Sequence, residues 1–115
     1  MLIRWTRAAL LLLAALPLAP RVGADEQWVP VIHAAAARHG VSGAALERTL
    51  RCESHLTPTA VGRAGELGMA QLHPRGLLPT FYARGFTDPF VAEEAIEFTA
   101  MMFAEGAARH WTCAR

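Results

Sequence analysis

The sequence predicts a mostly α-helical single domain. Its 115 residues leave room for one domain at most. Apolar residues recur at helical spacing, most clearly at Val91, Ala95, Phe98 and Met102, which would share one helix face. No segment alternates apolar and polar side chains as a half-buried strand does. We therefore expect helices joined by loops.

The N-terminal segment is typical of a secretory signal peptide. Arg4 and Arg7 precede an unbroken run of alanine and leucine over 8–16, and small residues follow at 22–24. The alternative is a membrane anchor, but a span needs about 20 apolar residues and this run is too short. We expect 1–24 to be removed, and the protein to be secreted, periplasmic or associated with the cell wall.

The remaining domain, 25–115, carries eight basic and ten acidic side chains, a net charge of −2 with histidine neutral. No basic stripe remains, which argues against nucleic acid as a partner. We expect a monomer without a membrane span once the signal is removed. A domain of 91 residues has a thin core, so we expect a covalent cross-link to support it.

Local signals outline two helices in the first half of the domain. The first is predicted to begin near 28–30, where a proline suits the first turn, and to stop at Gly40. Ser42 is a natural N-cap for the second helix. Pro58 prevents continuation and disfavours helical geometry at the residue before it, so the second helix should end near 54–56.

The second half begins with a glycine-rich loop over 57–68. A short helix is expected to start at 69–72, and another to cover 77–82. The longest helix is predicted to open at Asp88, as the cap, with the following proline in its first turn. Gly106 should end it.

Cys52 and Cys113 are the only cysteines. An even pair in an exported chain favours a disulfide, which for a loop of about 60 residues stabilises by about 4 kcal/mol in the chain-entropy model. The alternative, a nucleophilic Cys52 thiol, has no base at a recognisable spacing. No metal site is expected, because the histidines form no ligand pattern: His33, His39, His55, His73 and His110.

Glu53 is the strongest candidate for a catalytic group. It lies seven residues after Leu46 and three after Leu50, so it shares the apolar face of the second helix. A carboxyl group there is partly desolvated, which raises its pKa. Cleavage of a glycosidic bond needs such an acid, because the leaving oxygen must be protonated. The alternative is an ordinary glutamate at a helix end.

A glycine-punctuated loop follows Glu53-Ser54. Pro58-Thr59-Ala60-Val61-Gly62 leads into Gly65-Glu66-Leu67-Gly68-Met69-Ala70-Gln71-Leu72. Glycine lets the backbone approach a ligand closely, and the amide of Gln71 offers a sugar both donor and acceptor. From roughly Trp28 to Cys113, this arrangement resembles the lytic transglycosylases, the peptidoglycan-cutting branch of the lysozyme-like superfamily.

The resemblance implies a lysozyme-like fold that cleaves the MurNAc–GlcNAc bond of peptidoglycan strands without water, metal or cofactor. Glu53 would first donate a proton to the leaving oxygen. It would then accept one from the C6 hydroxyl of the muramic acid, which closes a 1,6-anhydro ring. The positions expected to bind substrate are Ser54, Gly68, Met69, Gln71 and Tyr82.

The chain also departs from the family. The common glycine-Leu-Met-Gln order is Gly68-Met69-Ala70-Gln71 here, and Met69 is alternatively a core residue. The late helix, 94–99, lacks the family's tyrosine, and Tyr82 is the only tyrosine left as a candidate for that place. Trp111 could stack on a sugar, although an aromatic side chain beside a disulfide more often lies in the core.

Glu66 leaves the outcome of the reaction open. A second carboxylate is what a hydrolase uses to activate water or support the cationic transition state. Glu66 is the candidate for that role, with a charge at the loop rim as the alternative, whereas Asp88 is better explained as a cap. The rival functions are therefore a muramidase of the same fold and a cell-wall-binding module without activity.

Overall fold

The computed structural model describes residues 23–115, and the chain there is a mostly helical single domain. The signal-peptide prediction falls almost wholly on 1–22, outside the described residues. No helix within 23–115 has the length and apolar character needed to cross a membrane. The α-helices are α1 (Val29–His39), α2 (Gly43–Ser54), α3 (Leu77–Ala83) and α4 (Ala92–Ala104), with 3-10 turns at Glu26–Trp28, Ala108–His110 and Thr112–Ala114.

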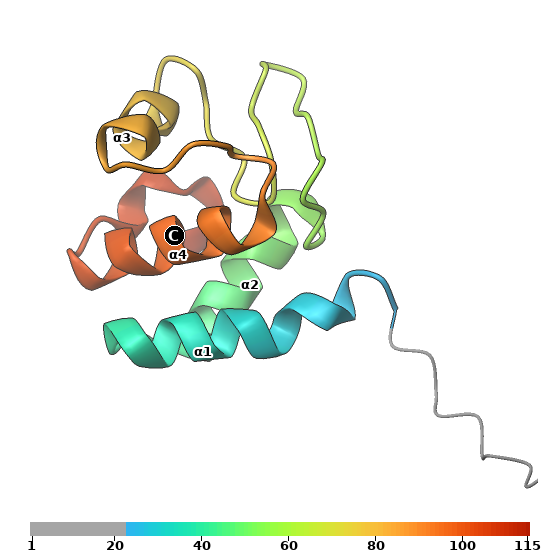
Figure 1. Cartoon of the computed structure of the whole chain (residues 1–115), viewed down its shortest axis with the longest axis vertical. Helices are drawn as coiled ribbons and strands as arrows, with labels where there is room; N and C mark the ends of the chain where they lie inside the picture. Colours follow the sequence, from blue (N-terminus) through green and yellow to red (C-terminus); the bar gives the residue numbers. More distant parts are fainter. Residues whose placement is uncertain (1–22) are drawn as a thin grey trace, which may run out of the picture.

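Helix α1 lies across one side of the molecule and packs against α2 and α4 (Figure 1). It ends where predicted, because Gly40 adopts a left-handed conformation with φ 66° that few other residues tolerate. The N-cap prediction for α2 is also confirmed. Ser42 Oγ accepts a hydrogen bond from the backbone N–H of Ala45 at 3.1 Å. Local signals thus set the end of α1 and the start of α2.

Helix α2 buries Leu46, Thr49 and Leu50 and ends at Ser54, within the predicted range. The two residues after it, His55 and Leu56, both have left-handed backbones, with φ of 54° and 57°. Side chains disfavour this conformation, yet the reversal turns Leu56 fully into the core. The chain therefore leaves α2 in a sharp turn directly beyond Glu53.

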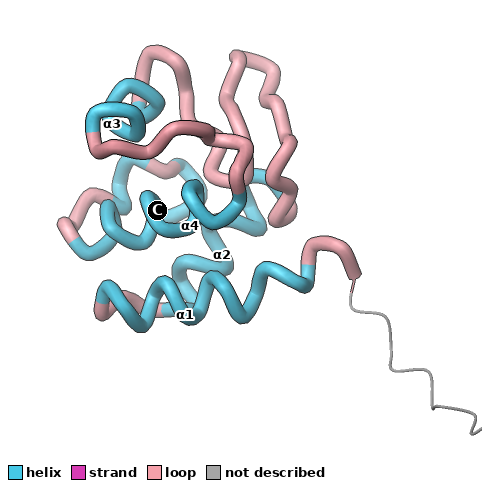
Figure 2. The backbone as a smooth tube through the Cα atoms, viewed as in Figure 1, coloured by secondary structure: helices cyan, strands magenta, loops and turns pink. Residues whose placement is uncertain are grey.

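The segment between α2 and α3 is loop along its whole length (Figure 2). The expectation of a short helix at 69–72 is wrong. Leu67 and Leu72 instead exchange backbone hydrogen bonds of 3.0 Å in an isolated antiparallel bridge, and Gln71 between them has a φ of 50°. This mutual pairing uses the N–H and C=O groups that a helix would need. The following helix, α3, closely matches its prediction.

The start of α4 also differs from its prediction. The helix begins at Ala92, and Asp88 caps no helix because its Oδ1 accepts from the N–H of Phe90 in a turn. Glu94 reaches back to accept from the N–H of Thr87 at 2.7 Å, which holds this segment as a loop. A local side-chain bond thus competes successfully with helix extension.

Three of the four residues on the predicted α4 face, Ala95, Phe98 and Met102, are buried, while Val91 is exposed. Phe98 packs edge-to-face on Phe81 of α3 and on Trp111 near the C-terminus. This aromatic contact places α3 and the C-terminal turns against α4. The α2–α3 loop and α3 both lie on the side of the molecule away from α1 (Figure 1).

Candidate active site

Five parts of the chain line an open cleft of about 740 Å³: the end of α2, the α2–α3 loop, α3, α4 and the C-terminal turns. This volume lies in the range of sites that bind small molecules. Charged, hydroxyl, amide and apolar groups all contribute to it. The lining residues are Glu53, Gly62, Arg63, Glu66, Gln71, His73, Gly76, Leu77, Thr80, Met102, His110, Trp111 and Thr112.

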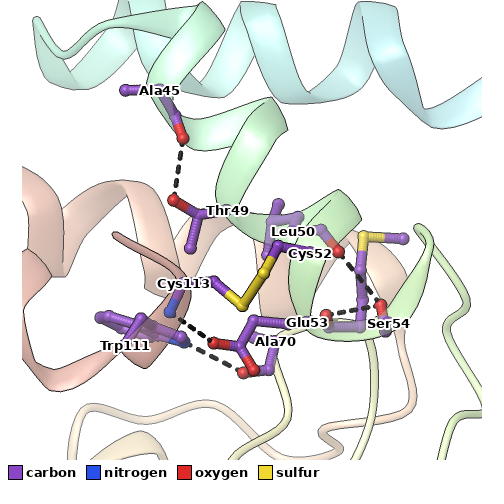
Figure 3. Close-up of a disulfide and its surroundings, with 10 residues drawn as sticks. Ala45, Thr49, Leu50, Cys52, Glu53, Ser54, Ala70, Trp111 and Cys113 are labelled. Carbon is purple, nitrogen blue, oxygen red and sulfur yellow. Dashed lines mark hydrogen bonds between the residues drawn. A yellow bond between two sulfur atoms is a disulfide. The ribbon is translucent and has the colours of Figure 1, made fainter. Parts of the chain in front are cut away.

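Glu53 is half-buried at the end of α2 and faces this cleft. Burial raises the pKa of its carboxyl group above the ordinary value, because desolvation disfavours the charged form. The backbone N–H of Cys113 donates to Glu53 Oε1 at 3.4 Å and partly offsets this effect (Figure 3). The negative charge of Glu66 adds to the increase in pKa. The site therefore holds a carboxyl group that keeps its proton to a higher pH than usual.

The C-terminal turns are linked to the end of α2 and to the α2–α3 loop. The predicted disulfide is present: Cys52 and Cys113 are joined, with their Cα atoms 5.8 Å apart. Trp111 is buried, and its Nε1–H donates to the carbonyl oxygen of Ala70 at 3.0 Å (Figure 3). These links hold the N–H of Cys113 against Glu53. The indole is thus a core group whose edge lines the cleft.

Gln71 and Glu66, both from the α2–α3 loop, line the cleft. Gln71 Nε2 donates to the carbonyl oxygens of Gly68, at 2.9 Å, and Ala60, at 3.3 Å. Its donors are therefore used within the protein, and its Oε1 is the group left for a ligand. Glu66 Oε2 accepts a hydrogen bond of 3.3 Å from the N–H of Ala64.

Three residues expected to bind substrate instead hold the loop in place and do not line the cleft. Ser54 is buried, and its Oγ donates to the carbonyl oxygen of Met69 at 2.7 Å and accepts from the N–H of Thr57. Met69 is fully buried in the core. Gly68 has a φ of 78°, and a Cβ there would collide with the carbonyl oxygen of Pro89.

Tyr82 lies outside the cleft. Its side chain is 48% exposed, and its ring packs edge-to-face on Phe81. It therefore does not take the place of the missing late-helix tyrosine beside Glu53. The residue of α4 that lines the cleft is Met102. Helix α4 therefore contributes an apolar side chain to the cleft.

Sequence reasoning missed Arg63, His73, His110 and Thr80 as cleft residues. They come from the loop, the C-terminal turns and α3, and no shared spacing connects them. In residues 23–115, no three side chains of His, Cys, Asp and Glu gather as a metal site would require.

This chain was compared with known proteins. Neither a family model nor a curated protein sequence matches it.

Proposed function

We propose that this protein is a peptidoglycan lytic transglycosylase, exported to the cell wall, that cleaves the MurNAc–GlcNAc bond. The observation that carries the proposal is the half-buried Glu53 carboxyl group in a cleft of about 740 Å³, with a raised pKa. A group with these properties suits protonation of a leaving oxygen. The Cys52–Cys113 disulfide fits an oxidising compartment.

In this mechanism Glu53 acts twice. As the C1–O bond breaks, its carboxylic acid gives a proton to the departing oxygen of the neighbouring GlcNAc, and positive charge develops at C1. The resulting carboxylate then takes the proton of the C6 hydroxyl. Oxygen O6 attacks C1 and closes the 1,6-anhydro ring, so the acid is regenerated and no water is consumed.

The rest of the cleft suits a glycan. Gln71 Oε1, Glu66 and Thr80 offer directional hydrogen bonds to hydroxyl and amide groups, while Leu77 and Met102 offer apolar surface to the sugar rings. The backbone N–H of Cys113 donates a hydrogen bond of 3.4 Å to the carboxyl group of Glu53 and so favours one orientation of it.

A hydrolytic muramidase is the second candidate, because Glu66 lines the same cleft as Glu53. A second carboxylate beside the substrate activates a water to attack C1 in a hydrolase. The two reactions differ in their products. Hydrolysis adds one water and leaves a reducing sugar, whereas ring closure adds nothing and leaves no reducing end.

Purified sacculi distinguish the candidates. We expect the oxidised protein to release muropeptides that lack the added water and resist reduction by borohydride, both measured by mass spectrometry. Products heavier by one water, and reducible, would assign hydrolysis. Binding to sacculi without any released product would indicate a cell-wall-binding module without activity.

The pH dependence of turnover tests the role of Glu53. The acid must carry its proton to protonate the leaving oxygen, so kcat/KM should fall as the pH rises through the pKa of Glu53. Since burial, and then the charge of Glu66, raise that pKa, the midpoint should lie above the ordinary 4.5. In Glu66→Gln the midpoint of the pH profile should move to lower pH, because the charge that raises the pKa of Glu53 is removed. In the control Glu93→Gln the midpoint should not change. An unmoved midpoint in Glu66→Gln contradicts this electrostatic coupling.

A further inference from the structure

Gly62 lies at the point in the cleft where two acceptor side chains converge. A Cβ built on this residue would overlap Glu66 Oε2 and would lie 2.7 Å from Gln71 Oε1. Both oxygens therefore rest directly over the bare Cα of Gly62. Any larger residue at this position would displace the two groups.

The orientation of the Gln71 amide is fixed by its surroundings. Its nitrogen lies within hydrogen-bond distance of two carbonyl oxygens, those of Gly68 and Ala60. Exchange of the amide oxygen and nitrogen would place acceptor against acceptor, so the oxygen must face Gly62. Gln71 thus presents only an acceptor to the cleft.

Glu66 presents a second acceptor at the same place. Its Oε2 receives one hydrogen bond of 3.3 Å, from the N–H of Ala64, and a carboxylate oxygen accepts more than one. None of the ion pairs within residues 23–115 involves Glu66. Two acceptor oxygens side by side repel each other unless a donor lies between them.

We propose that Glu66 Oε2 and Gln71 Oε1, brought together over Gly62, form an acceptor-only subsite that binds a hydroxyl or amide N–H donor of the glycan. The donor fixes the sugar relative to Glu53, which lines the same cleft. This inference rests on the proposed function for the class of ligand. In this subsite Glu66 binds and positions the substrate and does not activate water.

Gly62→Ala is a selective probe of this subsite. Gly62 has no left-handed backbone, and the atoms nearest to a new Cβ belong to the ends of two flexible side chains. The methyl group should therefore displace the acceptors and leave the loop intact. A merely structural glycine would instead lower the melting temperature.

The test measures binding of tetra-N-acetylchitotetraose, called chitotetraose below, by calorimetry in a Glu53→Gln background, where turnover is removed. We expect Glu66→Ala to weaken binding at least about tenfold, since a hydrogen bond to a charged acceptor is lost. Gly62→Ala should weaken it to a similar degree with an unchanged melting temperature. When Gly62→Ala is added to Glu66→Ala, the affinity should fall by no more than a further factor of about three, because the two changes act on one interaction. Glu93→Ala, on the exposed face of α4, is the control for loss of one negative charge.

Unchanged binding in Glu66→Ala would overturn the proposal. If turnover of sacculi then fell in Glu66→Ala with Glu53 intact, Glu66 would hold a water instead. Full additivity of Gly62→Ala and Glu66→Ala would also contradict it. To identify the donor, the Glu66→Ala loss is compared between chitotetraose and cellotetraose. Equal loss indicates a hydroxyl, and loss with chitotetraose alone indicates the acetamido N–H. Failure of the proposed function is a separate result, because the unsubstituted protein would then show no turnover of sacculi while the binding losses in the variants remained.

Discussion

Glu53→Gln should abolish release of muropeptides from sacculi and leave glycan binding nearly unchanged. General acid or base catalysis by one group contributes about 10²- to 10⁴-fold, and Glu53 is assigned both roles. We therefore expect turnover to fall at least about 10³-fold, with affinity for chitotetraose changed by less than about threefold. Release of soluble muropeptides and calorimetric binding measure the two effects.

The fold should survive this substitution. Glutamine has nearly the same shape, its amide oxygen can still accept from the N–H of Cys113, and it removes a carboxyl group whose charged form is disfavoured by burial. The melting temperature should therefore be equal or higher, as is common when an active-site group is neutralised. Glu93→Gln serves as the matched control, since it removes an exposed carboxylate of α4. Turnover at the unsubstituted rate in Glu53→Gln would remove Glu53 from the mechanism.

The second large effect is expected from loss of the Cys52–Cys113 disulfide. It links positions 61 residues apart, and in the chain-entropy model such a cross-link stabilises by about 4 kcal/mol. A domain of this size has a total stability of roughly 5–14 kcal/mol. The double variant Cys52→Ser, Cys113→Ser should therefore melt about 15–30 °C lower, measured by circular dichroism.

Reductant provides the control for this variant. Dithiothreitol should lower the melting temperature of the unsubstituted protein toward that of the double variant and leave the variant unaffected. Activity should fall in parallel at 37 °C, because the C-terminal turns carry the N–H of Cys113 that contacts Glu53. A melting temperature within a few degrees of the oxidised protein would show that contacts of Trp111 and Ala70 suffice to hold the terminus.

Elements whose ends depend on local chemistry could be predicted from the sequence. Gly40 stops α1 and Ser42 caps α2 because each signal acts within a few residues of itself. The start of α4 was mispredicted because Asp88 had a competing partner in the N–H of Phe90. The left-handed turn at 55–56 could not be predicted, because it contains neither glycine nor asparagine, the residues that usually adopt this conformation.

The features of the candidate site also divide into those that the sequence predicted and those that it did not. The sequence by itself determined a helical chain and the partly desolvated position of Glu53, because helix periodicity acts over a few residues. It also determined the pairing of Cys52 with Cys113, because two cysteines allow a single pair. Tertiary structure alone decided that Tyr82 lies outside the cleft, that Met102 and His110 line it, and that Gln71 offers only its oxygen. Those outcomes depend on hydrogen-bond partners and packing surfaces supplied by distant segments, which no spacing along the chain encodes.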